Sequence, residues 1–388
     1  MSKGATSLSD YATVAYTPDG SLLWAARYDG PGNSDDVAVG IAVWRDPSDG
    51  KDYAYVTGRS RASSTIAASN DFATIKYGSA GNQLWVQRYN GPANGNDNAQ
   101  NIGLDSGGNV YVTGTSAGKQ TGGNDFATIK YDPNGNPCWH LYNQPGVPFG
   151  EVSIAARYDG AVNSDTPFCG YGTVFNRGIP VDSDGNVYVT GMSIGSGTNY
   201  DYATIKYNGQ TGEPMWKGNP GIDANGAARY NGPANGSDMS LDIALDSEKN
   251  VYVTGVSVEG GAYHYATIKY DSSGVAVWKG NPGIDANGAA RYNGPGNGED
   301  AAFNIAVWSD PSYRMVYFYV AGHSLGSRTG QDIAIIKYDS FGHAVWQPDT
   351  SKGIDEEGAL RFNRQGVEIS PQDPLLSKLA EIQFVPVD

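Results

Sequence analysis

The chain has 388 residues, 53 of them glycine, and only 17% of the residues are charged. Its 41 acidic and 26 basic residues give a net charge of −15, which argues against nucleic acid and anionic membranes as partners. Two cysteines exclude a disulfide-rich scaffold and a thiolate zinc site. No apolar run approaches the ~18 residues of a membrane span and no signal-peptide pattern is present, so we expect no membrane insertion.

Two short phrases recur along the chain in a fixed order. The phrase Ala-Thr-Ile-Lys-Tyr occurs six times with small changes, at 12–16, 73–77, 127–131, 203–207, 266–270 and 334–338. Each copy is followed by a glycine-containing turn, a tryptophan and an arginine–aromatic pair. The phrase Tyr-Val-Thr-Gly, preceded by an apolar segment, occurs only five times, at 55–58, 111–114, 188–191, 252–255 and 319–322. Short β-branched and aromatic segments bounded by turn residues predict strands.

The repeat predicts an all-β fold made of four-stranded antiparallel blades. Such units bury their faces against one another around a closed ring, as in a six-bladed β-propeller. A flat β-solenoid would need shorter repeats. Because there are six outer hairpins and five inner ones, the first blade lacks its inner pair. Residues 382–387 alternate like a strand, so we expect a single domain over 1–388, with repeats at about 10–366 and 367–388 closing the ring. The alternative, that 368–388 is a linker to another domain, stays open.

The strings Asp-Tyr/Phe-Ala-Thr-Ile-Lys-Tyr, Gly-Asn-x-x-Trp and Gly-Asn-Val-Tyr-Val-Thr-Gly resemble the bacterial SBBP-type β-propeller repeat family over roughly residues 10–366. The resemblance implies a secreted or cell-surface protein of a bacterium or archaeon, and it implies no general catalytic motif. The long inserts of this chain depart from the family pattern.

An acidic residue precedes the Ala-Thr-Ile-Lys-Tyr strand in most repeats. The residues are Asp10, Asp71, Asp125, Asp201 and Asp332, with His264 in the fifth repeat. Folding 71–90 as a hairpin brings Asp71 near Arg88, which predicts a cross-strand ion pair. We favour this structural role over a catalytic one, because an active site is normally a single asymmetric constellation. The repeated lysines and tryptophans are predicted to pack one blade against the next.

Loops of the form Asn/Asp-Gly-Pro-x-Asn-x-x-Asp, and one looser version that ends at Asp165, lead into the inner strands. Their closing carboxylates are predicted to surround the channel mouth and are candidate ligand or ion sites: Asp36, Asp97, Asp165, Asp238 and Asp300. Carboxylate and carbonyl oxygens suit Ca²⁺, so calcium is a hypothesis for Asp97, Asp238 and Asp300. The alternative, which we favour, is that the loops are ordinary turns in which aspartate caps backbone N–H groups.

A Gly-Ile-Asp insert follows the tryptophan in the last three repeats. Its aspartates, Asp223, Asp285 and Asp355, are predicted to form a patch near the outer blade edge that binds a partner or ion, or that only packs. Cys138 and Cys169 flank the long insert of the third repeat and are a candidate disulfide pair.

Classical catalytic residues are not predicted, because the four histidines fall in different repeats and at different positions. The sequence therefore favours a non-catalytic extracellular or cell-surface binding or scaffold module, with a protein or carbohydrate ligand. One alternative is an enzyme, a hydrolase or lyase, that uses the acidic residues at the channel mouth. Another is an assembly protein that contacts its neighbours through the inserts.

Overall fold

The computed structural model describes residues 9–63, 69–118, 123–144, 147, 150–160, 179–195, 197–310, 315–328, 330–349, 351 and 353–362. Within them, every sheet is antiparallel and no α-helix is present, which confirms the predicted all-β class. No described helix is long and apolar enough to cross a membrane. The chain divides into two compact units, Met1–Arg229 and Tyr230–Asp388, and each is described by itself.

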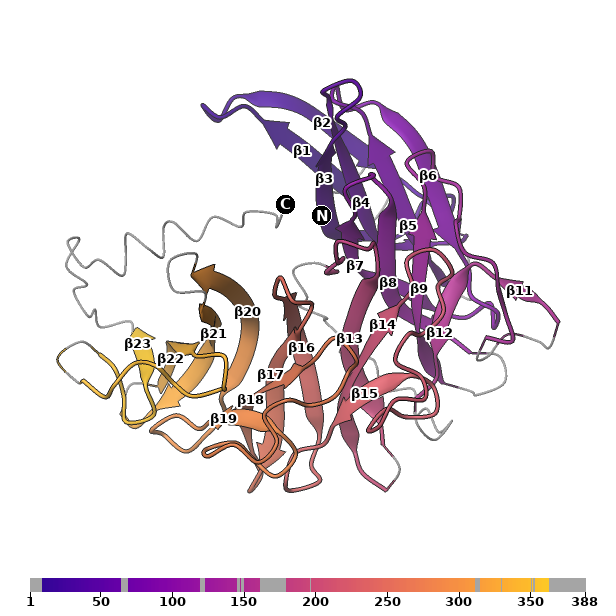
Figure 1. The fold of residues 1–388 in the computed structure, drawn as a ribbon. Helices are drawn as coiled ribbons and strands as arrows, with labels where there is room; N and C mark the ends of the chain where they lie inside the picture. The colour runs from indigo at the N-terminus through magenta and orange to yellow at the C-terminus, as the bar shows by residue number, and fades with distance from the viewer. Residues whose placement is uncertain are drawn as a thin grey trace. The chain divides into compact units, whose positions relative to one another are not determined.

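The first unit contains four sheets built from the repeats and one short extra pair (Figure 1). Its strands are β1 (Tyr11–Tyr16), β2 (Leu22–Tyr28), β3 (Asp36–Arg45), β4 (Asp52–Arg61), β5 (Asn70–Tyr77), β6 (Gln83–Tyr89), β7 (Asp97–Leu104), β8 (Val110–Ala117), β9 (Asn124–Tyr131), β10 (Leu141–Tyr142), β11 (Val152–Ser153), β12 (Ala155–Tyr158), β13 (Val187–Ile194), β14 (Tyr200–Tyr207) and β15 (Ala227–Tyr230), whose last residue starts the second unit. The sheet orders are β1-β2, β3-β4-β5-β6, β7-β8-β9-β12 and β13-β14-β15, with β10-β11 apart.

The second unit contains two four-stranded sheets with the same order of strands. They are β16 (Asp238–Leu245), β17 (Val251–Glu259), β18 (Ala262–Tyr270) and β19 (Ala289–Tyr292), followed by β20 (Ala301–Asp310), β21 (Met315–Gly326), β22 (Gly330–Tyr338) and β23 (Ala359–Phe362). The four predicted strands of a repeat therefore pair in chain order. The number of blades and the closure of a ring stay predictions, and the closing segment 367–388 lies outside the described residues.

Tryptophans of one repeat pack on the turn of the next. Trp85 of β6 lies against Gly135, whose φ of +88° falls in the left-handed region, and a Cβ built there would lie 3.0 Å from the indole. The same ring lies 6.2 Å from Tyr131, centroid to centroid, in the neighbouring sheet. Glycine supplies both the turn geometry and the room for the indole at this position. This contact confirms the predicted packing role of the tryptophans.

The repeated lysines also join neighbouring repeats. Lys76 Nζ donates to the carbonyl of Pro133 at 2.9 Å and lies 4.3 Å from the Tyr53 ring centroid. Lys130 Nζ donates likewise to Gly209 at 2.8 Å. The buried stems cover apolar surface while the ammonium groups find carbonyl and aromatic partners.

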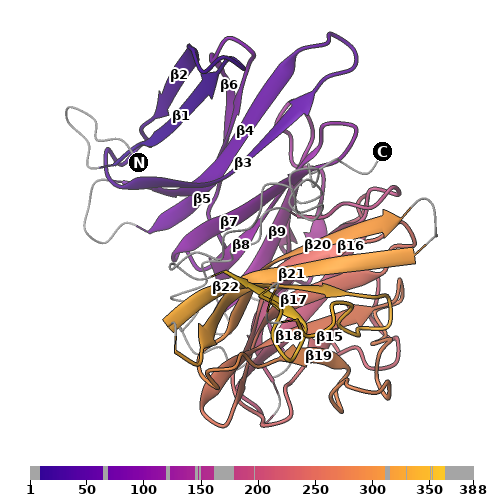
Figure 2. The same cartoon turned by 90° about the vertical axis from the view of Figure 1, so that its left-hand side faces the viewer.

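One apolar position differs sharply between the repeats. Three isoleucines that each pair with a valine of the neighbouring inner strand are almost fully buried. Their exposed fractions are 4% for Ile102, 5% for Ile243 and 7% for Ile305. Ile41 occupies the same register position in β3 and is 59% exposed. Figure 2 shows β1 and β2 as a separate two-stranded pair beside β3–β6. The first repeat has no described inner strands, so nothing described there covers Ile41.

Candidate functional site

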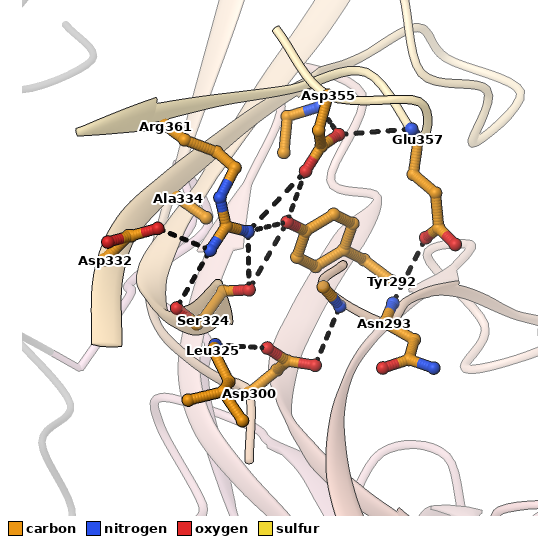
Figure 3. Close-up of polar contacts among 12 residues, drawn as sticks. Tyr292, Asn293, Asp300, Ser324, Leu325, Asp332, Ala334, Asp355, Glu357 and Arg361 are labelled. Atoms are coloured by element: carbon orange, nitrogen blue, oxygen red, sulfur yellow. Dashed lines mark hydrogen bonds and ion pairs between the residues drawn. The ribbon is translucent and has the colours of Figure 1, made fainter. Parts of the chain in front are cut away.

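A repeated arginine network surrounds the start of each inner strand. In the last repeat, Arg361 Nη2 donates to Asp332 Oδ2 at 2.9 Å and to the Ser324 carbonyl at 3.0 Å (Figure 3). Its Nη1 donates to Ser324 Oγ at 2.8 Å and to the hydroxyl of Tyr292, which lies on β19 in the preceding sheet, at 2.6 Å. The arginine thus joins three strands of its own sheet to the adjacent sheet.

The same network recurs in the first unit. Arg88 Nη2 lies 2.8 Å from Asp71 Oδ2, which confirms the cross-strand pair predicted from the hairpin. Arg157 and Asp125 form the equivalent pair, and neither side chain has exposed surface. These repeated aspartates therefore neutralise arginines.

The closing carboxylates of the loops accept hydrogen bonds from their own loop. Each one accepts the amide of the glycine six residues earlier, at 2.6–2.8 Å: Asp36 from Gly30, Asp97 from Gly91, Asp238 from Gly232 and Asp300 from Gly294. All four are at most 1% exposed. Each loop is also closed by a turn, in which an asparagine with φ of 41° to 52° donates its amide to that glycine's carbonyl.

The bonds favour the turn hypothesis for these loops. The second carboxylate oxygen of Asp97 accepts the amide of Ala117 at 3.2 Å, and that of Asp300 accepts the amide of Leu325 at 2.9 Å. Calcium at Asp97, Asp238 and Asp300 stays a prediction. Asp165 lies outside the described residues.

Asp97 and Asp300 differ in their electrostatic surroundings. Burial raises the pKa of Asp97 to about 6, and the charge of Asp71 adds to the rise, against hydrogen bonds from Ser116 and Gly91. Burial also acts on Asp300, but hydrogen bonds from His264, Ser324 and two backbone amides outweigh it and lower its pKa. His264 Nδ1 lies 3.7 Å from Asp300 Oδ2. The histidine of the fifth repeat therefore stands where the other repeats carry aspartate.

The insert aspartates form local turns that contact the preceding repeat. Each accepts two amides of its own turn through Oδ1 and a tyrosine hydroxyl of the preceding repeat through Oδ2. The tyrosine contacts are Asp223 with Tyr158 at 2.6 Å, Asp285 with Tyr230 at 2.7 Å and Asp355 with Tyr292 at 2.7 Å. The insert next to Asp355 also reaches a loop, because Asn293 donates its amide to Glu357 at 3.1 Å. A binding role for this patch stays a prediction.

One group of carboxylates was not assembled by the sequence analysis. Asp10, Asp29 and Asp36 each place a carboxylate oxygen within 4.8 Å of the other two. The register explains the proximity, because Tyr11 pairs with Tyr28 and the two flanking aspartates lie at the same end of β1-β2. The sequence also pointed to this group of carboxylates, because position 29 is aspartate where the second, fourth and fifth repeats have asparagine.

Cys138 is half-buried, and its thiol lies 3.7 Å from the Asn136 carbonyl. Burial raises the pKa of this thiol. Cys169 lies outside the described residues, so the disulfide stays a prediction.

The strand order, the inter-repeat contacts and the loop geometry are those of a repeat protein, and a family model agrees. Residues 84–119 match the SBBP family model, a beta-propeller repeat. The match extends from β6 to just beyond β8 and includes the Asp97 loop. It confirms the SBBP resemblance in this part of the chain. No curated protein matches the chain.

Three solved structures are similar to this chain, each with low sequence identity and a low TM-score. One is an exo-1,5-alpha-L-arabinanase from a bovine ruminal metagenomic library, with 15% identity, 79% of this chain and 94% of that one covered, and a TM-score of 0.32. A family 43 glycoside hydrolase from Bacillus licheniformis has 13% identity, coverage of 85% and 84%, and a TM-score of 0.30. A levansucrase mutant from B. megaterium has 10% identity, coverage of 90% and 88%, and a TM-score of 0.32.

Proposed function

We propose that the chain is a six-bladed β-propeller in which the segment 367–388 supplies inner strand material to the first blade. The exposure of Ile41 supports this closure. Its counterparts Ile102, Ile243 and Ile305 are covered, whereas Ile41 is 59% exposed in the described structure. Val39 and Val43 on the same strand are also exposed, at 51% and 63%. An uncovered apolar strip at one repeat is where an additional strand would bury the most surface.

We infer further that this propeller is a non-catalytic binding or scaffold module that acts outside the cell or on its surface. The observation that carries this proposal is the bonding of the loop carboxylates. Asp97 is fully buried and accepts the amides of Gly91 and Ala117. A carboxylate held in this way fixes a loop and cannot reach a substrate. Repetition of the same arrangement in Asp300 supports a structural role.

The exposed tips of the same loops are available for a ligand. Asn96 and Glu299 are exposed and occupy one loop position that differs between repeats. Rigid loops with varied exposed residues are typical of binding surfaces on repeat scaffolds. A protein or a carbohydrate at the cell surface is the proposed ligand.

A second candidate function is glycoside or related hydrolysis at Asp29. This carboxyl is exposed, and its pKa is raised by desolvation and by the charges of Asp10 and Asp36, although Arg27 opposes the rise. A carboxylic acid with a raised pKa is what a general acid requires. The spacing is less favourable, because carboxylate pairs in glycosidases stand about 5–9.5 Å apart and leave room for the sugar or water.

The two functions are separated by testing binding and bond cleavage on one polysaccharide panel. The panel contains plant and bacterial polysaccharides, and retention on immobilised glycan is measured beside release of reducing sugar. The binding proposal predicts no release of reducing sugar, and a carbohydrate ligand predicts retention as well. Release by the full chain that is lost in Asp29→Asn and kept in Asp52→Asn would establish the hydrolase instead. Asp52 is a matched control because it is an exposed surface carboxylate paired with Arg45.

A further inference from the structure

The carboxylates of the first repeat form a more negative group than their counterparts in the second, fourth and fifth repeats, which carry asparagine at the position of Asp29. Asp10, Asp29 and Asp36 place oxygens within 4.8 Å of one another. The cation recorded beside them is Arg27, whose Nη2 lies 3.4 Å from Asp10 Oδ2 and whose side chain is 44% exposed. Three carboxylates and one arginine leave a formal charge of −2 when all are ionised.

One oxygen of this group is buried and has no partner. Asp36 is 1% exposed, and its Oδ2 accepts the amide of Gly30 at 2.7 Å. Its Oδ1 has no hydrogen-bond partner among the residues that the structure describes. A buried, unpartnered carboxylate oxygen beside two other carboxylates is costly unless a cation or proton binds there.

The second and fifth repeats place protein groups beside the equivalent carboxylates. In the second repeat Asn90 replaces the third carboxylate, the half-buried Arg88 binds Asp71, and Asp97 Oδ1 accepts the amide of Ala117. In the fifth repeat His264 replaces one carboxylate, and its Nδ1 lies 3.7 Å from Asp300 Oδ2. The first repeat has neither the asparagine nor the histidine, so its charge calls for another cation.

The oxygen ligands and their spacing accommodate Ca²⁺. Two oxygens on one Ca²⁺, each at about 2.3–2.6 Å, lie at most about 5 Å apart, and the oxygens of this group lie within 4.8 Å of one another. A set of oxygens with no nitrogen or sulfur disfavours zinc. We propose that Asp10, Asp29 and Asp36 bind a Ca²⁺ ion that ties the β1-β2 hairpin to β3.

The proposal does not depend on the proposed binding function, and a Ca²⁺ ion held by Asp29 would exclude the general-acid role considered for that residue. It also differs from the calcium hypothesis for Asp97, Asp238 and Asp300, because it requires the two residues that flank the β1-β2 hairpin. Asp36 connects that hairpin to β3 through a second contact, since its amide donates to the Ser9 carbonyl at 2.7 Å. A bound ion would therefore reinforce a junction that the backbone already forms.

Calorimetric titration of the chelator-treated full chain with CaCl₂ tests the site. The variant Asp29→Asn places at position 29 the residue that four other repeats carry, so the fold has a precedent for it. We expect the wild type to bind at least one Ca²⁺ with a dissociation constant of about 10⁻⁵–10⁻³ M. We expect Asp29→Asn to bind one ion fewer, or to bind at least tenfold more weakly. Asp52→Asn, an exposed control, should bind like the wild type.

A second readout is terbium luminescence excited through tyrosine, because Tyr11 and Tyr28 adjoin Asp10 and Asp29 in sequence. The signal should appear in the wild type, be displaced by excess Ca²⁺ and be weak in Asp29→Asn. Equal Ca²⁺ binding by the wild type and Asp29→Asn would overturn the proposal. Absence of Ca²⁺ binding to the correctly folded wild type would overturn it as well, and would leave a proton as the neutralising group.

Discussion

Arg157 and Asp125 form an ion pair with no exposed surface, in which Nη2 of the arginine lies 2.6 Å from Oδ2 of the aspartate. The arginine also donates to Ser116 Oγ at 2.6 Å and to the Tyr89 hydroxyl at 2.9 Å. It therefore connects sheet β7-β8-β9-β12 with sheet β3-β4-β5-β6.

Replacing Arg157 with alanine should destabilise the protein strongly. Removal of one partner of a buried pair leaves an uncompensated charge and typically costs about 3–5 kcal/mol. Arg45→Ala is the control, because the side chains of Arg45 and its partner Asp52 are 70% and 58% exposed and an exposed pair contributes no more than about 1 kcal/mol. Urea unfolding measures both changes. Equal losses of unfolding free energy in the two variants would contradict the expectation that the buried ion pair contributes more than the exposed one.

Tyr89→Phe isolates the contact between the sheets. The variant keeps the ring, which packs on Phe72 at 5.4 Å, and removes only the hydroxyl that Arg157 contacts. Loss of a hydrogen bond to a charged group should reduce the free energy of unfolding by about 1.5–3 kcal/mol. Tyr16→Phe, at a tyrosine that is 61% exposed, should change it by less than about 0.5 kcal/mol. If Tyr89→Phe left the free energy of unfolding unchanged, this hydroxyl would not stabilise the contact between the sheets.

The carboxyls of Asp97 and Asp300 should give opposite pH dependences. The folded pKa of Asp97 is about 6, above its ordinary value of 3.8, so its stabilising contribution is complete below about pH 4 and is lost as the pH rises through 6. The folded pKa of Asp300 is lowered, so its contribution is present above its ordinary pKa and is lost as the pH falls through the folded value.

Urea midpoints from pH 3 to pH 7, in buffers with chelator, measure this contrast. The wild-type midpoint minus that of Asp97→Asn should fall with rising pH, mainly between pH 4 and 6. The corresponding difference for Asp300→Asn should rise with pH at the acid end of the range. Two parallel trends would show that burial of Asp97 and the hydrogen bonds to Asp300 do not set the charge states of these residues.

Gly135→Ala should cost more than the same change at Gly20. Both residues end the turn between outer strands, with φ of +88° and +84°, so the backbone strain of alanine is the same. The new Cβ would lie 3.0 Å from the Trp85 indole at Gly135 and would meet nothing within 4 Å at Gly20. We expect about 1 kcal/mol at Gly20 and about 1–3 kcal/mol more at Gly135. Thermal unfolding of the two variants gives the difference, and equal losses would show that Trp85 does not fill this turn.

Much of the strand order could be predicted from the sequence, because the repeated phrases mark the strands directly. The pairing of Arg88 with Asp71 was also predictable, since both lie in one hairpin. The bond from Arg88 to Tyr28 was not, because it connects two sheets and no local pattern encodes it.

The candidate site was predicted only in part. Asp36 was predicted as a loop residue. Its burial follows from the hydrogen bond that it accepts from the amide of Gly30, six residues earlier, and the residue types of the loop do not predict that bond. Asp10 and Asp29 were missed although the hairpin places them side by side, because each was considered within its own repeated phrase. Departure from the repeat at position 29 was the informative signal.

Closure of the ring by the C-terminal segment is the central structural claim, and hydrogen exchange measures it directly. Amide exchange of the full chain, followed by mass spectrometry of peptides covering 382–387 and β3, is compared with that of a chain lacking 379–388. The account predicts slow exchange at 382–387, faster exchange at β3 in the shortened chain, and a sharply lowered melting temperature. Exchange of 382–387 at the rate of an unstructured peptide, with β3 unchanged by the deletion, would contradict closure of the propeller by this segment.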